Sequence, residues 1–94
     1  MSISVIKRDG RVKEFDELRI VNAIVKGYTD VYGEEGSAIE SKYTELDTAY
    51  MNIAARIDDL KTSFITVEEI QDIVVDELNK VNPTVAKSYA DYRE

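Results

Sequence analysis

Polar and apolar residues follow a strand-like pattern at the start of the chain and a helical pattern over most of the remainder. Residues 3–8 and 11–15 form two β-prone runs that lie on either side of Asp9-Gly10. Asp-Gly is a strong hairpin signal, because a two-residue type I′ turn needs positive φ at both central positions. The pattern therefore predicts an antiparallel hairpin closed by a two-residue loop.

A two-residue loop fixes the expected register of this hairpin. Arg8 would lie opposite Arg11, and Ile6 opposite Lys13, with successive side chains on alternating faces. One face would then carry Ile6, Arg8, Arg11, Lys13 and Phe15, and the other Ile3, Val5, Lys7, Val12 and Glu14. Each face would be apolar toward the strand ends and charged toward the turn.

Two helices are expected next. Asp16 is a typical N-cap for a helix over residues 17–32, which the glycines around residues 33–36 would end. Ser37-x-x-Glu40 matches a capping box and predicts a second helix over residues 37–60. Apolar residues recur along it at spacings of three and four, which favours a core stripe over a base-stacking surface: Tyr43, Leu46, Tyr50, Ile53, Ile57 and Leu60.

The last third of the chain predicts a short strand and two more helices. Residues 63–66 are β-prone, and Thr66-x-x-Glu69 is a second capping box that opens a helix over residues 67–80. Asn82-Pro83 starts a final helix, which carries Val85, Tyr89 and Tyr92 inward. The order β-β-α-α-β-α-α predicts an α+β fold, a four-helix bundle capped by a small three-stranded sheet, in a single domain over residues 1–94.

Composition narrows the possible functions. Hydrophobic residues at 44% and charged residues at 33% are typical of a folded domain. The absence of Cys and His removes the thiol nucleophile, the usual general base and the commonest metal ligands, so the chain is not expected to be an enzyme by itself. No apolar run could span a bilayer, and we expect a cytoplasmic protein with no membrane partner.

Charge is distributed unevenly. The net charge is −7, yet Lys7, Arg8, Arg11 and Lys13 cluster around the expected turn. The acidic body disfavours nucleic acid, which needs a broad basic face. A small anion at the basic turn fits this distribution. So does a solvated turn tip, or a hairpin that grips an acidic protein partner.

Three parts of the chain resemble one family in order and spacing. Val5–Gly10, Glu14–Asp16 and Arg19–Ile24 resemble the opening of an ATP-cone domain. Ile65–Val74 is similar to the third helix of that family, and Val85–Arg93 to its closing helix. The resemblance covers nearly the whole chain.

The resemblance implies a regulatory module at the N-terminus of a ribonucleotide reductase, with the anaerobic type slightly favoured. In that family ATP keeps the enzyme active and dATP switches it off, usually through a change in oligomeric assembly. The chain would be an excised domain, with the catalytic domain and neighbouring subunits as partners. The acidic pairs Asp58-Asp59 and Asp76-Glu77 are expected on outer faces as candidate contacts. The alternative is a degenerate cone, or a small protein-interaction module, that binds no nucleotide.

Site residues follow from the same resemblance. ATP or dATP would act as effector, with Mg²⁺ carried by the phosphates and no metal ligand from the protein. Phosphate contacts are implied for Lys7, Arg8, Arg19, Lys87 and Arg93. Adenine or ribose contacts are implied for Val5, Lys13, Phe15, Asp16, Ile20, Thr66, Ile70 and Gln71. Lys13, Gln71 and Glu94 depart from residues that some members carry, and Lys87 and Arg93 could instead form a solvated helix face.

Overall fold

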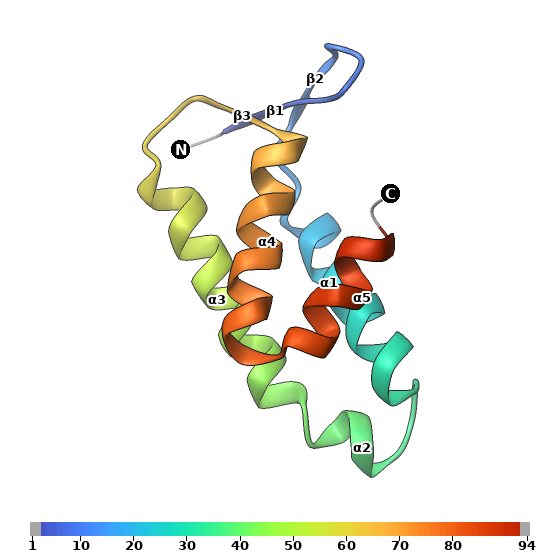
Figure 1. Ribbon diagram of the computed structural model, residues 1–94. Coiled ribbons are helices and arrows are strands. Elements are labelled where there is room, and N and C mark those ends of the chain that lie inside the picture. Colours follow the sequence, from blue (N-terminus) through green and yellow to red (C-terminus); the bar gives the residue numbers. More distant parts are fainter. Residues whose placement is uncertain (1–2, 93–94) are drawn as a thin grey trace.

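The fold was analysed in a computed structural model that describes residues 3–92 (Figure 1). It has the predicted α+β fold and the predicted order of elements. The elements are β1 (Ser4–Ile6), β2 (Val12–Glu14), α1 (Glu17–Tyr32), α2 (Ser37–Glu40), α3 (Tyr43–Asp59), β3 (Phe64–Thr66), α4 (Val67–Val81) and α5 (Pro83–Tyr92).

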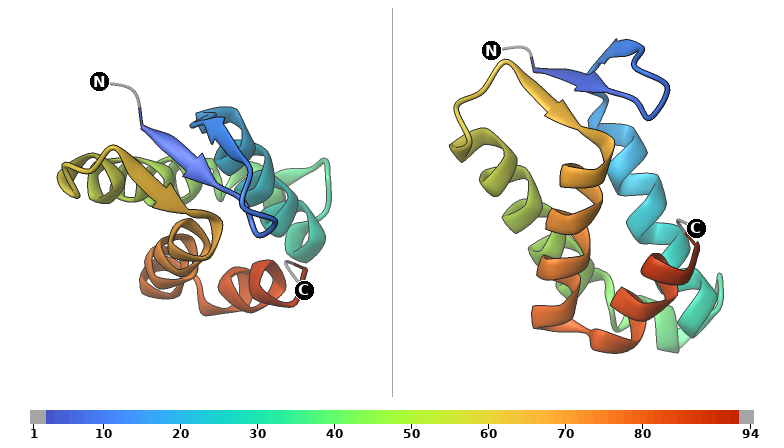
Figure 2. Two further views of the ribbon diagram at one scale, coloured as in Figure 1. Left: turned by 90° about the horizontal axis from the view of Figure 1, so that it is seen from above. Right: turned by 45° about the horizontal axis from the view of Figure 1, so that its top comes forward.

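Four helices form the bundle, and the sheet caps one end of it (Figures 1 and 2). Helix α4 packs against α3 and α5, and α1 packs against the same two helices. The single turn of α2 lies at the end of the bundle opposite the sheet (Figure 1). The strand order is β2-β1-β3, with β1 antiparallel to β2 and parallel to β3. Within residues 3–92, no helix is long and apolar enough to cross a membrane.

Three predicted helix starts are confirmed by their hydrogen bonds. The Asp16 carboxylate accepts from the Leu18 amide at 3.0 Å. Thr66 and Glu69 form the reciprocal capping box at the start of α4. Asn82 Oδ1 accepts from the Val85 amide at 3.1 Å. Each bond satisfies an amide that the first helical turn would otherwise leave unpaired.

The hairpin loop is one residue longer than predicted. Lys7 N donates to Arg11 O at 2.8 Å, and Gly10 N donates to Lys7 O at 2.9 Å, so three residues lie between the last paired positions. Gly10 has φ of 89°, and the Asp9 carboxylate accepts from the Arg11 amide at 3.0 Å. This is a turn followed by a left-handed glycine, the usual three-residue hairpin.

The longer loop shifts the register by one residue and so moves the side chains of β2 to the other face relative to those of β1. Val5 pairs with Lys13 and Ile6 with Val12, so the predicted pairings of Ile6 with Lys13 and of Arg8 with Arg11 are wrong. Ile3, Val5 and Phe15 now share the face that packs on the helical core. The predicted register would have divided these three apolar side chains between the two faces, and core burial outweighs the local preference for a two-residue turn.

The predicted second helix is divided in two. Helix α2 ends at Glu40 and α3 begins at Tyr43, with Ser41 and Lys42 in a turn between them. The Ser41 hydroxyl donates to the Ala38 carbonyl at 2.8 Å, which is the type of local bond that competes with helix continuation. The capping box predicted at Ser37 is also wrong, because α2 has Gly36 as its N-cap and no side-chain cap.

Most of the predicted core stripes are buried, with exceptions at helix ends. Tyr43 and Leu60, at the two ends of α3, are about half exposed, and Tyr92 at the end of α5 is 65% exposed. These three were predicted to face inward. The buried core is formed by Ile20, Ile24, Tyr28, Ile39, Leu46, Ala49, Ile53, Ile57, Ile65, Ile73, Val74, Leu78, Val85, Ala86 and Tyr89.

The prediction that Asp76-Glu77 lies on an outer face is wrong for Glu77, which is buried. Its side chain is 4% exposed and accepts from Arg56 Nη1 and from Lys80 Nζ, each at 2.9 Å. Asp76 stays at the surface and pairs with the same Arg56 nitrogen at 2.7 Å. Glu77 therefore joins α3 to α4 and is not available to a partner.

Candidate functional site

A cavity of about 240 Å³ lies where the hairpin meets the helices. The inner face of the hairpin forms one wall, and the first turns of α1 and α4 form two others. Helix α5 adds a single residue, Tyr89. The view from above shows how the sheet crosses over the ends of these helices (Figure 2).

Most of the predicted site residues lie in the wall of this one cavity. The shifted register makes this possible, because it turns Val5, Lys7 and Lys13 toward the same side. The predicted residues that line the cavity are Val5, Lys7, Lys13, Phe15, Asp16, Arg19, Ile20, Ile70 and Gln71.

The basic side chains of the wall repel one another. The pKa of Lys7 is lowered, first by the positive charge of Lys13 and then by partial burial and by Arg11 and Arg19. Asp9 acts in the opposite direction but is the weakest of these influences. The hairpin thus holds several positive charges closer together than they would lie in an unfolded chain.

Lys7, Lys13 and Arg19 share a further property. None of the three forms an ion pair, whereas every other Lys or Arg within residues 3–92 has a carboxylate partner. The whole chain has 19 acidic and 12 basic residues, so partners are not scarce. The unpaired cations are therefore concentrated at the cavity, where a bound anion would be stabilised.

A shallow basic notch adjoins the cavity at the hairpin turn. Lys7 and Val67 line both hollows, whereas Arg8, Asp9 and Arg11 line only the notch. Arg8 reaches toward α4, where its Nε lies 3.1 Å from a Glu68 oxygen and its Nη2 donates to Gln71 Oε1 at 3.4 Å. Arg8 therefore stands at the entrance, linked to Gln71 of the cavity wall.

The remaining predicted site residues lie elsewhere. Thr66 is outside the cavity wall, and its hydroxyl is used in the capping box of α4. Lys87 is exposed on α5 and paired with Asp91 at 2.9 Å, which raises its pKa. Arg93 lies outside the described residues.

Four residues of the cavity wall were not predicted. Ala23 and Val67 are each one helical turn from a predicted site residue, Arg19 and Gln71, so helical spacing could have identified them. Glu14 and Tyr89 are the other two that line the wall among residues 3–92. Tyr89 was expected only as a core residue, and its sequence position gives no sign that it reaches the cavity.

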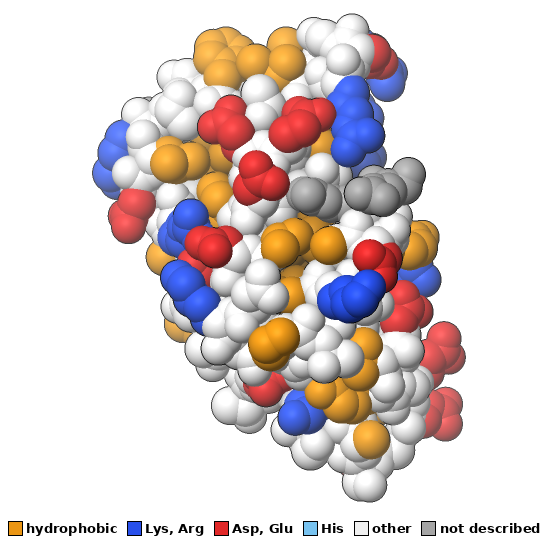
Figure 3. All heavy atoms as spheres, in the orientation of Figure 1, with side chains coloured by type: hydrophobic (Ala, Val, Ile, Leu, Met, Phe, Trp, Pro, Cys, Tyr) orange, Lys and Arg blue, Asp and Glu red, His pale blue; other side chains and the backbone are white. Residues whose placement is uncertain are grey.

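The surface around this end of the molecule is divided by charge. Figure 3 shows basic side chains gathered below the hairpin turn, beside acidic side chains over the start of α4. Glu68 and Glu69 lie in that first turn of α4. Within residues 3–92, no cluster of three carboxylate, His or Cys side chains could hold a metal ion. The cavity wall combines cationic side chains with apolar ones such as Val5, Phe15 and Ile20.

Two comparisons with known proteins identify the family of this chain. Residues 3–94 match the family model of the ATP cone domain. The chain is also 35% identical, over 97 aligned residues, to the alpha subunit of ribonucleoside-diphosphate reductase of Chlamydia trachomatis serovar D. That alignment covers 99% of this chain but only 9% of the relative. The predicted resemblance is therefore confirmed: the chain belongs to the ATP-cone domain family, whose members are nucleotide-binding regulatory modules and not the catalytic part of a reductase.

Proposed function

We propose that the cavity binds an adenine nucleotide, ATP or dATP, and that occupancy controls the overall activity of a ribonucleotide reductase. The observation that carries this proposal is the set of unpaired cations, Lys7, Lys13 and Arg19, on the wall of an otherwise partly apolar cavity. A nucleotide has the matching chemistry, because it joins an aromatic base to a polyanion. Each charge-assisted bond to a phosphate would contribute about 1.5–3 kcal/mol.

The proposed orientation follows from where the two kinds of side chain lie. The base and ribose would enter the cavity against Val5, Phe15 and Ile20, with Asp16 and Gln71 as polar contacts. The phosphates would extend along Lys7 toward the basic notch that Arg8 borders. Any Mg²⁺ would be held mainly by the phosphates themselves.

Regulation would act through other parts of a longer reductase, in the cytoplasm. ATP and dATP differ by one hydroxyl, so they can have opposite effects only if the domain contacts them differently in two states. The catalytic domain and neighbouring subunits are the proposed partners, with oligomeric assembly as the output. The preference for the anaerobic type stays a prediction.

Isothermal titration of this chain with ATP, dATP and GTP, each with Mg²⁺, tests the proposal. We expect the adenine nucleotides to bind with micromolar Kd, GTP to bind much more weakly, and the affinity to fall as salt screens the cations. The Lys7→Ala, Arg8→Ala double variant should lose most of the binding, and Lys61→Ala, which removes a paired cation away from the cavity, should bind normally.

Two results would count against the proposal. Unchanged binding in the double variant would show that the nucleotide lies elsewhere. No binding of any nucleotide by the unmodified chain would favour the alternative function, a degenerate cone or a protein-interaction module. The apolar outer face of the sheet, where Val12 is 56% and Phe64 54% exposed, would then be the first surface to test.

A further inference from the structure

Helix α5 starts from one buried asparagine. Asn82 is 7% exposed and lies between α4 and α5. Its amide donates to α4, with Asn82 N to Leu78 O at 2.7 Å, and its carbonyl accepts from Ala86 N of α5 at 3.0 Å. Its side-chain oxygen caps α5 through the Val85 amide at 3.1 Å.

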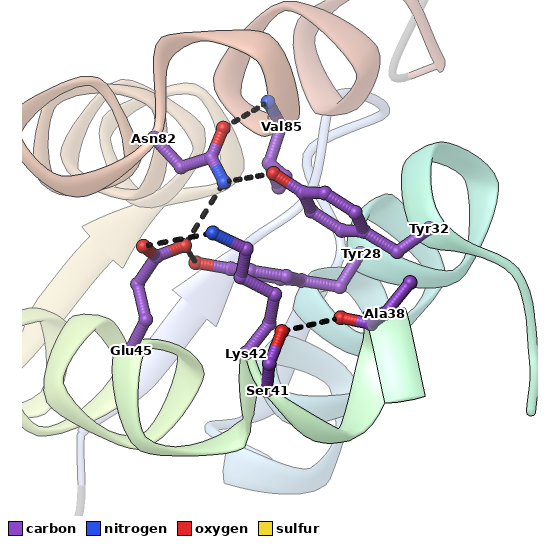
Figure 4. Close-up of polar contacts among 8 residues, drawn as sticks. All are labelled: Tyr28, Tyr32, Ala38, Ser41, Lys42, Glu45, Asn82 and Val85. Carbon is purple, nitrogen blue, oxygen red and sulfur yellow. Dashed lines mark hydrogen bonds and ion pairs between the residues drawn. The ribbon is translucent and has the colours of Figure 1, made fainter. Parts of the chain in front are cut away.

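The side-chain nitrogen of Asn82 connects the start of α5 to the other two long helices, α1 and α3. Nδ2 donates to the Tyr32 hydroxyl of α1 at 2.8 Å and to Glu45 Oε2 of α3 at 2.9 Å. Figure 4 shows this nitrogen directed between the two partners. Through its backbone and its side chain, this one buried residue therefore links the start of α5 to every other long helix of the bundle.

Glu45 extends this hydrogen-bond network. Its Oε2 also accepts from the hydroxyl of the fully buried Tyr28 at 2.7 Å, and Lys42 Nζ lies 4.0 Å from its Oε1 (Figure 4). Within residues 3–92, no buried side-chain nitrogen or oxygen lacks a hydrogen-bond partner. Fully satisfied buried networks specify a single arrangement, because each alternative leaves a polar group unpaired.

The position of α5 matters because Tyr89 is its only contribution to the cavity wall. Tyr89 lies seven residues after Asn82, about 10 Å along the helix axis. Between them α5 lies close against α1, where a Cβ added to Gly27 would come within 3.3 Å of Val85 Cγ1. A small change in the direction of α5 at Asn82 would therefore move Tyr89 relative to the hairpin wall.

We infer that Tyr89 is a nucleotide-contacting residue, and that Asn82, bonded to Tyr32 and Glu45 at the opposite end of the bundle, is its positioning residue. This inference rests on the proposed function of the cavity. Tyr89 offers ring surface for the base or ribose, and the Asn82 network holds that ring at the correct distance from Val5 and Ile20 of the same wall.

A double-mutant cycle with titration calorimetry tests the inference. Tyr89→Leu should weaken ATP binding about five- to tenfold, the usual contribution of an aromatic contact. Asn82→Ala should weaken binding in the unmodified chain but have no further effect in the Tyr89→Leu background, because coupled residues are not additive. A loss of general stability would not produce that dependence on Tyr89.

Two further variants keep the test valid if Asn82→Ala folds poorly. Tyr32→Phe removes only the hydroxyl that accepts from Asn82 and should weaken binding in the same direction. Ser41→Ala removes a hydrogen bond at the same end of the bundle that does not involve α5, and should leave Kd unchanged. Thermal unfolding of each variant ensures that binding is measured on folded protein.

The possible failures are distinguishable. If the unmodified chain binds no nucleotide, both the proposed function and this inference fail. If it binds but Tyr89→Leu binds equally well, only the inference fails. If Asn82→Ala weakens binding equally in both backgrounds, Asn82 does not act through Tyr89 and its positioning role is wrong.

Discussion

Lys13 is the main cause of a lowered pKa at Lys7, because the hairpin turns both ammonium groups toward the same cavity. Neither side chain has an ion-pair partner among residues 3–92, although 19 acidic residues are present in the chain. Like charges held together in this way destabilise the folded state when no ligand is bound. An anion placed between them would reverse that effect.

Removing one of these charges should therefore weaken nucleotide binding without lowering the stability of the nucleotide-free protein. We expect Lys13→Ala to leave the nucleotide-free protein as stable as before or more stable, since a repulsion is lost. The same variant should weaken ATP binding about ten- to a hundredfold, the value of one charge-assisted contact. Urea unfolding and titration calorimetry measure the two quantities. A variant that loses stability and retains binding would contradict the role assigned to Lys13.

Nucleotide binding should also change the protonation of Lys7. The lowered pKa of Lys7 means that its charged form is disfavoured in the free protein, and phosphate oxygens nearby would raise that pKa again. Binding at alkaline pH should then take up protons. Titration in buffers of different ionisation enthalpy measures this uptake.

Lys7→Arg is the matched variant for the protonation experiment. Arginine keeps the positive charge throughout the accessible pH range, so the uptake should disappear while binding persists. Equal heats in all buffers at alkaline pH, for the unmodified chain, would mean that phosphates do not approach Lys7.

Glu77 should govern part of the acid sensitivity of the fold. Bonds from Lys80 and Arg56 lower its pKa below the usual 4.5. Because the folded-state pKa is lowered, this stabilisation is present above about pH 4.5 and is lost as the pH falls through the lower folded value. Glu77→Gln should cost about 1–3 kcal/mol at neutral pH and flatten the acid side of the stability profile. Urea unfolding across this pH range measures both effects.

Asp76 provides the control for Glu77. It bonds the same Arg56 nitrogen, but its side chain is 60% exposed. Asp76→Asn should therefore cost less than about 1 kcal/mol. If Glu77→Gln and Asp76→Asn lose equal stability, burial of Glu77 does not determine its contribution.

Substitution of Thr66 should lower the stability of the fold and leave nucleotide binding nearly unchanged. Its hydroxyl accepts from the Glu69 amide at 3.1 Å and completes the capping box. We expect Thr66→Ala to cost about 1 kcal/mol and Thr66→Ser to restore most of it, with little change in nucleotide Kd in either variant. A loss of affinity in Thr66→Ala at unchanged stability would instead support the ribose contact that the family resemblance implies.

Local sequence determined the elements and most of their boundaries. Asp16, Thr66 and Asn82 begin the helices that were expected from them, because a cap acts through amides only two or three residues away. Lys7, Lys13 and Arg19 also lie within a short stretch of chain that spans the hairpin and the first turn of the next helix, but the face that Lys7 and Lys13 share depends on the register.

Tertiary structure decided the register and the composition of the cavity wall. Local turn preference favoured a two-residue loop, but the burial of Ile3, Val5 and Phe15 on one face favours the pairing of Val5 with Lys13. Tyr89 reaches the cavity only because α5 is fixed at Asn82 by partners 37 and 50 residues away in the chain. Such choices depend on which surfaces meet across the core, and a pattern of neighbouring residues carries no information about that.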